Sequence, residues 1–128
     1  MSLSHDLTLK WSSGSRSITK IISATGGAQT SVDEDVADSE TDYLIAFTCD
    51  VSQIQAIYIN STQDVLLETN SGAGSADVLS LVANEPYVWW STSLLTNLLT
   101  EDVTALYITN ASGASATISV EVLYDPTP

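Results

Sequence analysis

One seven-residue pattern, which occurs twice, constrains the fold of this chain more than any other feature. Residues 54–60 read IQAIYIN and residues 103–109 read VTALYIT. Each copy is followed by a short turn and a second apolar run, at residues 65–69 and 117–124. Alternating apolar residues on both sides of a turn predict a β-hairpin. Two such hairpins can cover each other's apolar faces, so the repeat predicts a two-sheet antiparallel β-sandwich.

Glycine and proline, the residues that interrupt strands, fall only between the alternating segments. Glycine occupies positions 14, 26, 27, 72, 74 and 113, and proline occupies positions 86, 126 and 128. Interruptions in this arrangement are typical of an all-β sandwich or barrel. We therefore predict an all-β fold, a jelly-roll-like sandwich of about eight or nine strands. An immunoglobulin-type sandwich is the alternative, but its Cys…Trp…Cys spacing is absent because Cys49 is the only cysteine.

The length of 128 residues leaves room for one domain with a real core. We predict a flexible N-terminal arm at residues 1–6, a single sandwich domain at residues 7–125 and an extended tail at residues 126–128. Within the domain, residues 43–49 carry apolar side chains on both faces of an alternating pattern. This pattern predicts a central strand that is covered on both sides.

The chain is strongly acidic, with 16 Asp and Glu against 3 Lys and Arg and a net charge of −13. Such a charge repels phosphate backbones and anionic lipid surfaces, so we expect neither nucleic-acid nor membrane binding. No stretch approaches the ~20 apolar residues of a membrane span. Residues 1–30 also lack the apolar run of an export signal, so we expect no signal peptide.

Residues that would support catalysis are sparse. A nucleophilic Cys49 or serine would need a histidine base, and His5 is the only histidine. A glycosidase would need two carboxylates in a cleft, for which Glu68, Glu101 and Glu121 are the candidates. The simpler interpretation is that these carboxylates are solvated on outward faces. We therefore predict that the protein is not an enzyme and has no catalytic or cofactor-binding residue.

An acidic segment at residues 33–42 raises the question of calcium. Asp33, Glu34, Asp35 and Asp38 offer hard oxygen ligands close together in the sequence. The glycine of an EF-hand loop is missing, so a solvated acidic loop is the simpler interpretation. We assign no metal ligand, and the sequence leaves calcium binding in this segment open.

The aromatic cluster of Tyr87, Trp89 and Trp90 is the best candidate for an interface. Adjacent residues of a strand point to opposite faces, so one tryptophan can fill the core while the other is exposed. An exposed tryptophan would anchor a protein partner or stack on a sugar ring. Packing at the core or its rim is the simpler alternative.

Several short motifs together carry a resemblance to a known family. They are SVDE at 31–34, AIYI at 56–59, LETN at 67–70, PYVW at 86–89, DVT at 102–104, YITN at 107–110 and LYDPTP at 123–128. In this combination the chain resembles small head structural proteins of tailed bacteriophages, among them capsid decoration or cement proteins. The resemblance covers residues 30–128, and its motifs are structural rather than catalytic.

The resemblance implies a virion protein that binds the outer face of an icosahedral head and stabilises it. Its partner would be the major capsid protein, and it would itself be a homo-oligomer, a trimer at local threefold axes. Assembly in the host cytoplasm would place it on the capsid surface. The alternative is a carbohydrate-binding β-sandwich module, on a phage tail or baseplate, with an exposed aromatic face at Trp89 or Trp90.

Overall fold

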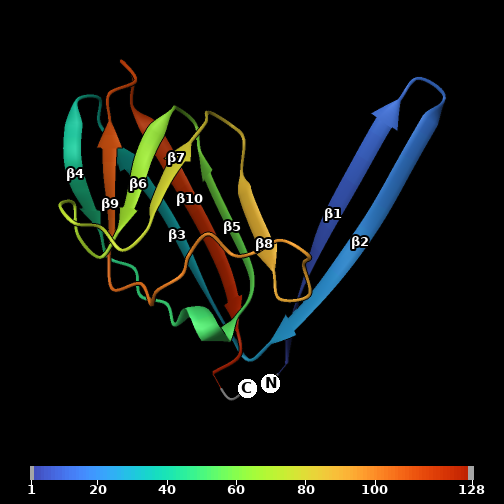
Figure 1. The fold of residues 1–128 in the computed structure, drawn as a ribbon. Coiled ribbons are helices and arrows are strands. Elements are labelled where there is room, and N and C mark those ends of the chain that lie inside the picture. Colours follow the sequence, from blue (N-terminus) through green and yellow to red (C-terminus); the bar gives the residue numbers. More distant parts are fainter. Residues whose placement is uncertain (1, 127–128) are drawn as a thin grey trace.

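The protein is built almost entirely of antiparallel strands (Figure 1). The computed structural model describes residues 2–126. The strands are β1 (Leu3–Ser13), β2 (Arg16–Gly26), β3 (Ala28–Val36), β4 (Glu40–Ile45), β5 (Ile54–Ser61), β6 (Val65–Thr69), β7 (Val78–Leu81), β8 (Tyr87–Trp90), β9 (Leu106–Asn110) and β10 (Ala116–Tyr124). A short 3-10 helix, η1 (Val51–Gln53), precedes β5. Within the described part of the chain, no helix has the length and apolarity to cross a membrane.

Strands β3 to β10 form two four-stranded sheets that pack face to face. The first, here called sheet B, has the order β3-β10-β5-β8, and the second, sheet C, has the order β4-β9-β6-β7. The pairs are nested, β3 with β10, β4 with β9, β5 with β8 and β6 with β7, and successive pairs alternate between the sheets. This is the strand order of a jelly roll. The predicted fold class, a two-sheet jelly-roll-like sandwich of about eight or nine strands, is confirmed.

The core lies between the two sheets, because each strand turns one apolar face inward. Ile118 and Val120 of β10 are buried, and the residues between and beside them are more exposed. Leu67 and Ile108 of sheet C are fully buried in the same apolar cluster. The period of two that the sequence shows is therefore the period with which side chains enter the core.

The two copies of the repeat are placed differently from the prediction. The first copy is β5 in sheet B, and the second leads into β9 in sheet C. β5 pairs with β10 and β9 pairs with β6, so the first strand of each copy pairs with the second strand of the other copy. The predicted hairpins are wrong, because the turns after β5 and β9 carry the chain across the core from one sheet to the other.

Both crossings begin at fully buried polar residues, Ser61 after the first copy and Asn110 at the same position after the second. Each side chain accepts a hydrogen bond from the amide two residues further on, which favours a local turn over continued extended chain. Asn110 Nδ2 also donates to the carbonyl oxygens of Val36 and Ala114, at 3.0 and 2.8 Å. These bonds satisfy polar groups at the corners of the sandwich, where strand pairing has ended.

Residues 43–49 do not form the predicted central strand. β4 ends at Ile45 and lies at the edge of sheet C. Ile45 and Phe47 are buried, whereas Leu44 is 57% exposed on the other side. The apolar outer side of this segment has no cover from the rest of the described chain, so its two-sided pattern misled the prediction.

Residues 3–26 form a separate two-stranded sheet of β1 and β2, here called the arm, which projects from the sandwich (Figure 1). The strands pair in continuous register around Gly14, whose φ of 56° suits the glycine position of a type II′ turn. The domain boundary therefore differs from the predicted one. Residues 3–6, expected to be flexible, are paired strand, and residues 7–26 lie outside the sandwich. Residue 1 and residues 127–128 of the predicted arm and tail lie outside the described residues.

Candidate interaction surface

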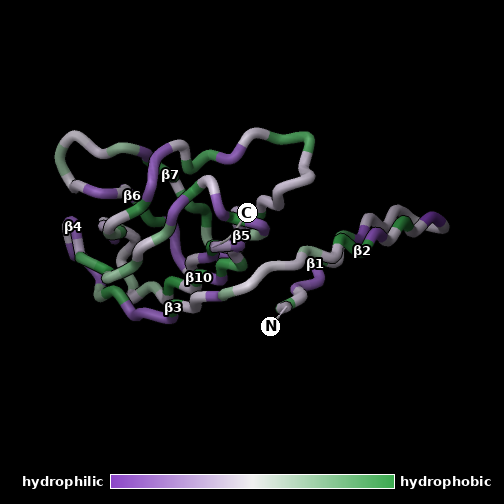
Figure 2. Tube along the Cα trace, turned by 90° about the horizontal axis from the view of Figure 1, so that it is seen from below, coloured by the Kyte–Doolittle hydropathy of each residue, from purple (hydrophilic) through white to green (hydrophobic). Residues whose placement is uncertain are grey.

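The arm is an amphipathic ribbon, because alternate residues of a strand share a face. Its apolar face carries Leu3, Leu7, Leu9, Trp11, Ile18, Ile22 and Ala24, together with His5, Arg16 and Lys20. The opposite face consists mainly of serine and threonine, with Ile21 as its large apolar residue. Figure 2 shows the ribbon extending beyond the sandwich, with apolar residues along its length.

The base of the apolar face lies on the outer side of sheet B. His5 Nε2 is hydrogen-bonded to Oε1 of Gln29 on β3 at 2.7 Å. Gly26 approaches β10 so closely that a Cβ atom there would lie 2.7 Å from the carbonyl oxygen of Tyr124. The amide of Gly27 donates to the same oxygen at 3.1 Å. These contacts fix the direction in which the arm leaves the sandwich.

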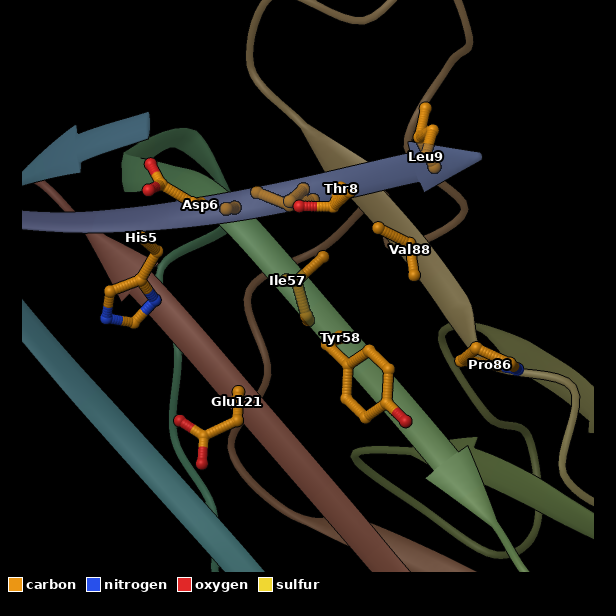
Figure 3. Close-up of a pocket in the computed structure, with 11 residues that line it drawn as sticks. His5, Asp6, Thr8, Leu9, Ile57, Tyr58, Pro86, Val88 and Glu121 are labelled. Carbon is orange, nitrogen blue, oxygen red and sulfur yellow. The ribbon is translucent and has the colours of Figure 1, made fainter. Parts of the chain in front are cut away.

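A groove of about 590 Å³ lies between the arm and sheet B (Figure 3). Residues 5–9 of β1 form one wall, and Tyr58, Val88 and Glu121 contribute from β5, β8 and β10. Figure 3 shows β1 passing above β5 and β8, with His5 over β10. The groove is mixed in character, since apolar side chains line most of it and carboxylates stand at its border.

The distal half of the arm has no cover. Residues 8–21 are all exposed, and on the apolar face Leu9, Trp11 and Ile18 are 46%, 71% and 47% exposed. The total accessible surface is 7326 Å², against about 6,600 Å² for a compact protein of this mass. An isolated two-stranded hairpin is at best marginally stable in water. An exposed apolar strip of this kind is a candidate interaction site.

Charge separates the arm from the sandwich. Lys10, Arg16 and Lys20, which are all the lysines and arginines of the chain, lie in the arm, where Asp6 is the one acidic residue. The remaining 15 acidic residues lie at residues 27–128, which contain no lysine or arginine. The arm therefore has a net charge of +2 and attracts surfaces like that of its own sandwich.

The predicted interface residues Tyr87, Trp89 and Trp90 are all half-buried, on the edge strand β8. Tyr87 and Trp89 pack against the core, and register places Trp90 on the outer side of the sheet, beside Ala56. Burial raises the pKa of the Tyr87 hydroxyl, and the hydrogen bond that it accepts from a backbone amide opposes this rise. The three rings do not share one face, so they do not form a continuous aromatic platform.

Tyr87 and Trp89 instead hold the loop that follows β8. Trp89 Nε1 donates to the carbonyl oxygen of Leu95 at 2.8 Å, and the amide of Leu98 donates to the Tyr87 hydroxyl at 2.8 Å. The side chains of Leu94, Leu95 and Leu98 are 102%, 71% and 56% exposed. The aromatic residues that the sequence singled out thus present three leucines to solvent rather than forming the contact surface alone.

Leu94 and Leu95 are the most exposed of the large apolar side chains on the described sandwich. Together with the exposed Tyr58 and Pro86 and the half-buried Val88, which line the groove, we call these leucines and Leu98 the β8 patch. The other exposed large apolar residues of the sandwich are separated, on β4 and at β7.

The candidate nucleophile and base lie apart. Cys49 is half-buried, and desolvation, with smaller effects of Asp50 and Asp102, raises the pKa of its thiol to about 11. A thiol with such a pKa is a weak nucleophile at neutral pH. His5 lies on the arm and lines the groove beside sheet B, whereas Cys49 lines a different hollow with Asp102 and Tyr124.

The candidate carboxylates are also dispersed. Glu68 lies on β6 of sheet C and accepts a hydrogen bond from Ser75, whereas Glu121 lies on β10 of sheet B and accepts one from Ser31 at 2.7 Å. Glu101 is in the loop that leads to β9. The structure does not bring these three side chains into one cleft.

The candidate calcium ligands diverge: Asp33, Glu34 and Asp35 lie on the paired strand β3, whereas Asp38 lies in the turn before β4 and accepts a hydrogen bond from the amide of Gly113 at 2.8 Å. Asp33 and Asp35 accept hydrogen bonds from Ser119 and Thr117 of β10, both at 2.8 Å, on the outer side of sheet B. Glu34, on the other side, accepts from the hydroxyl of Tyr43 at 2.9 Å and thereby raises the pKa of that hydroxyl. Among the described residues, no group of three or more potential metal ligands comes together.

Comparisons with protein-family models, with curated proteins and with solved structures found no match to this chain. The resemblance to phage head proteins therefore stays a prediction. The arm was the main feature that sequence reasoning missed. The sequence did carry one signal that sets this segment apart: all three basic residues of the chain lie at positions 10–20.

Proposed function

We propose that this protein is a non-enzymatic structural protein of a tailed-bacteriophage head, which binds the outer face of the icosahedral shell and stabilises it. The observation that carries the proposal is the arm, an ordered ribbon with an uncovered apolar face that projects from a closed sandwich. This geometry suits a link between neighbouring subunits. The reason for choosing a phage head as the assembly is the resemblance of the motifs in residues 30–128 to phage head proteins.

The acidic sandwich supports a position on the outside of a head. Fifteen acidic residues without a lysine or arginine repel packaged nucleic acid. In this proposal the protein binds the major capsid protein as a homo-oligomer, a trimer at local threefold axes. It assembles in the host cytoplasm and remains on the virion surface.

Stabilisation would follow from binding alone. A ligand that binds only the expanded lattice stabilises it by RT ln(1 + [L]/Kd), which is about 2.7 kcal/mol for each site at a hundredfold excess over Kd. Because the lattice repeats the site many times, small contributions add up over the shell. No chemical step is required.

The test uses heads of a tailed phage whose genome carries this gene, purified from a deletion strain. The added protein is expected to cosediment saturably with expanded heads, more weakly with unexpanded heads, and to raise the temperature at which expanded heads release DNA. Unexpanded heads serve as the matched control for nonspecific adsorption. Absence of cosedimentation with expanded heads, or a gene that occurs only outside phage structural gene clusters, would contradict the proposal.

The carbohydrate-binding alternative required an exposed aromatic face at Trp89 or Trp90. Both side chains are half-buried and on opposite sides of β8. The described structure offers no observation that favours this alternative, and we do not propose it.

A further inference from the structure

We infer that the arm of one molecule docks its distal apolar face on the β8 patch of a second copy of the same chain. This inference goes beyond the proposed function, because it concerns contacts between copies and holds or fails without a phage head. It identifies the two surfaces that form the oligomer, the arm on one molecule and the β8 patch on its neighbour.

The base of the arm shows what its apolar face binds. There the face lies on the outer side of sheet B of its own sandwich, with His5 bonded to Gln29 and Gly26 against β10. The distal half continues the same face with Leu9, Trp11 and Ile18. The β8 patch, at the free edge of sheet B, is the apolar surface that we assign as the binding site for this continuation.

The arm cannot cover its distal face with its own sandwich. β1 has 11 residues, which span about 35 Å at ~3.3 Å per residue. Pairing is continuous from Leu3 with Gly26 to Ser13 with Arg16. A ribbon paired along its whole length does not fold back on itself, so cover for Trp11 and Ile18 must come from another molecule.

Charge complementarity selects a second copy as that molecule. Lys10, Arg16 and Lys20 give the distal arm its positive charge, and the sandwich supplies only negative charge. Near the β8 patch, Glu121 lines the adjacent groove and Glu85 precedes Pro86. Each copy carries both complementary surfaces, so arms exchanged between copies can close a symmetric ring.

The β8 patch is suited to receive the ribbon because it is ordered before binding. The backbone bonds to Tyr87 and Trp89 fix the loop whose leucines are exposed. A preorganised patch loses little entropy when it is covered. Exchange of arms must bury upwards of ~1,000 Å² to give a stable interface.

The first experiment measures the mass of the full chain by light scattering after size exclusion, and its association by sedimentation. The wild-type protein is expected at a small multiple of 13.6 kDa. The double variant Trp11→Ser/Ile18→Ser is expected to weaken association at least about 30-fold, as loss of an aromatic hot spot does. The matched control is Ile21→Ser, since Ile21 is 57% exposed on the opposite face of the same ribbon, and it should leave the mass unchanged.

The second experiment separates arm-to-patch contacts from arm-to-arm contacts. The double variant Leu94→Ser/Leu95→Ser removes apolar groups from the patch. By itself it is expected to weaken association about as much as the arm variant does. Mixing the two variants lets the intact arm of one bind the intact patch of the other, so association should return in part, while the reverse contact stays defective. An oligomer that survives the patch substitutions, or a mixture without recovery, overturns the docking site. A wild-type protein that stays monomeric at 100 µM overturns the inference that a second copy covers the arm. The arm would then bind a different partner, such as a shell protein.

Discussion

The arm and the sandwich are built from the same kind of alternating sequence, yet their apolar faces end in opposite environments. Ile108 on β9 and Ile18 on β2 both lie on the apolar face of a paired strand, but the first is fully buried and the second is 47% exposed. The difference is the presence of an opposing sheet within the same chain. The sandwich therefore buries its own apolar faces, whereas the apolar face of the distal arm stays exposed to solvent.

The largest expected effect on stability comes from shortening one isoleucine in each region, Ile108 in the core and Ile18 on the arm. Ile108→Ala is expected to lower the free energy of unfolding by about 3–4 kcal/mol, because it leaves a cavity in the core. Ile18→Ala, the matched control, is expected to change it by less than about 0.5 kcal/mol. Urea unfolding followed by circular dichroism at low micromolar concentration measures both. Equal losses would show that the arm is packed as tightly as the core.

The next largest effect on stability is expected at the two corners where the chain crosses from one sheet to the other. Asn110→Ala is expected to cost about 2–3 kcal/mol, because it removes from a fully buried corner the amide that donates to the carbonyl oxygens of Val36 and Ala114 and leaves them only the hydroxyls of Ser115 and Ser112 as side-chain donors. Ser61→Ala, at the equivalent corner, removes only local bonds within its own turn and is expected to cost about 1 kcal/mol. The same unfolding assay applies, and a larger cost for Ser61 would reverse the assignment.

A smaller effect tests how firmly the arm is joined to the sandwich. Gly26→Ala places a Cβ atom 2.7 Å from a backbone oxygen of β10, so we expect a loss of about 1–2 kcal/mol and displacement of the arm base. Gly27→Ala is the control, because its nearest neighbour would be a proline side chain at 3.4 Å. Hydrogen exchange should show faster exchange of amides in β2 for the first variant only. Unchanged exchange there would mean that the arm pivots freely.

The smallest effect is a pH dependence that belongs to the sandwich alone. Hydrogen bonds from the Ser52 hydroxyl and amide lower the pKa of Asp50 below its usual value of 3.8. Its contribution to stability is therefore complete above about pH 4 and is lost as the pH falls through the lowered folded-state pKa. Asp50→Asn should cost a little stability at pH 7, and the difference from wild type should shrink toward pH 3. A difference that grows on acidification would contradict this assignment.

The candidate site was predictable in part. The sequence singled out Tyr87, Trp89 and Trp90 as unusual, and the structure places them at the edge strand. Their hydrogen bonds to the leucine loop depend on where residues 91–98 return to β8, which no local pattern specifies. The arm escaped prediction for a related reason, since Leu7, Leu9 and Trp11 alternate as a core strand does.

The sequence by itself determined where strands form, which side of most of them is apolar, and where the chain turns, because these follow from local periodicity and from glycine and proline. It also determined the separation of charge, with every lysine and arginine at residues 10–20. Only the tertiary structure decided that β5 pairs with β10 rather than β6, that β4 is an edge, and that the arm stands outside the sandwich. The physical reason is that alternation marks a face for burial without naming what covers it, and pairing between distant strands depends on the packing of the whole core.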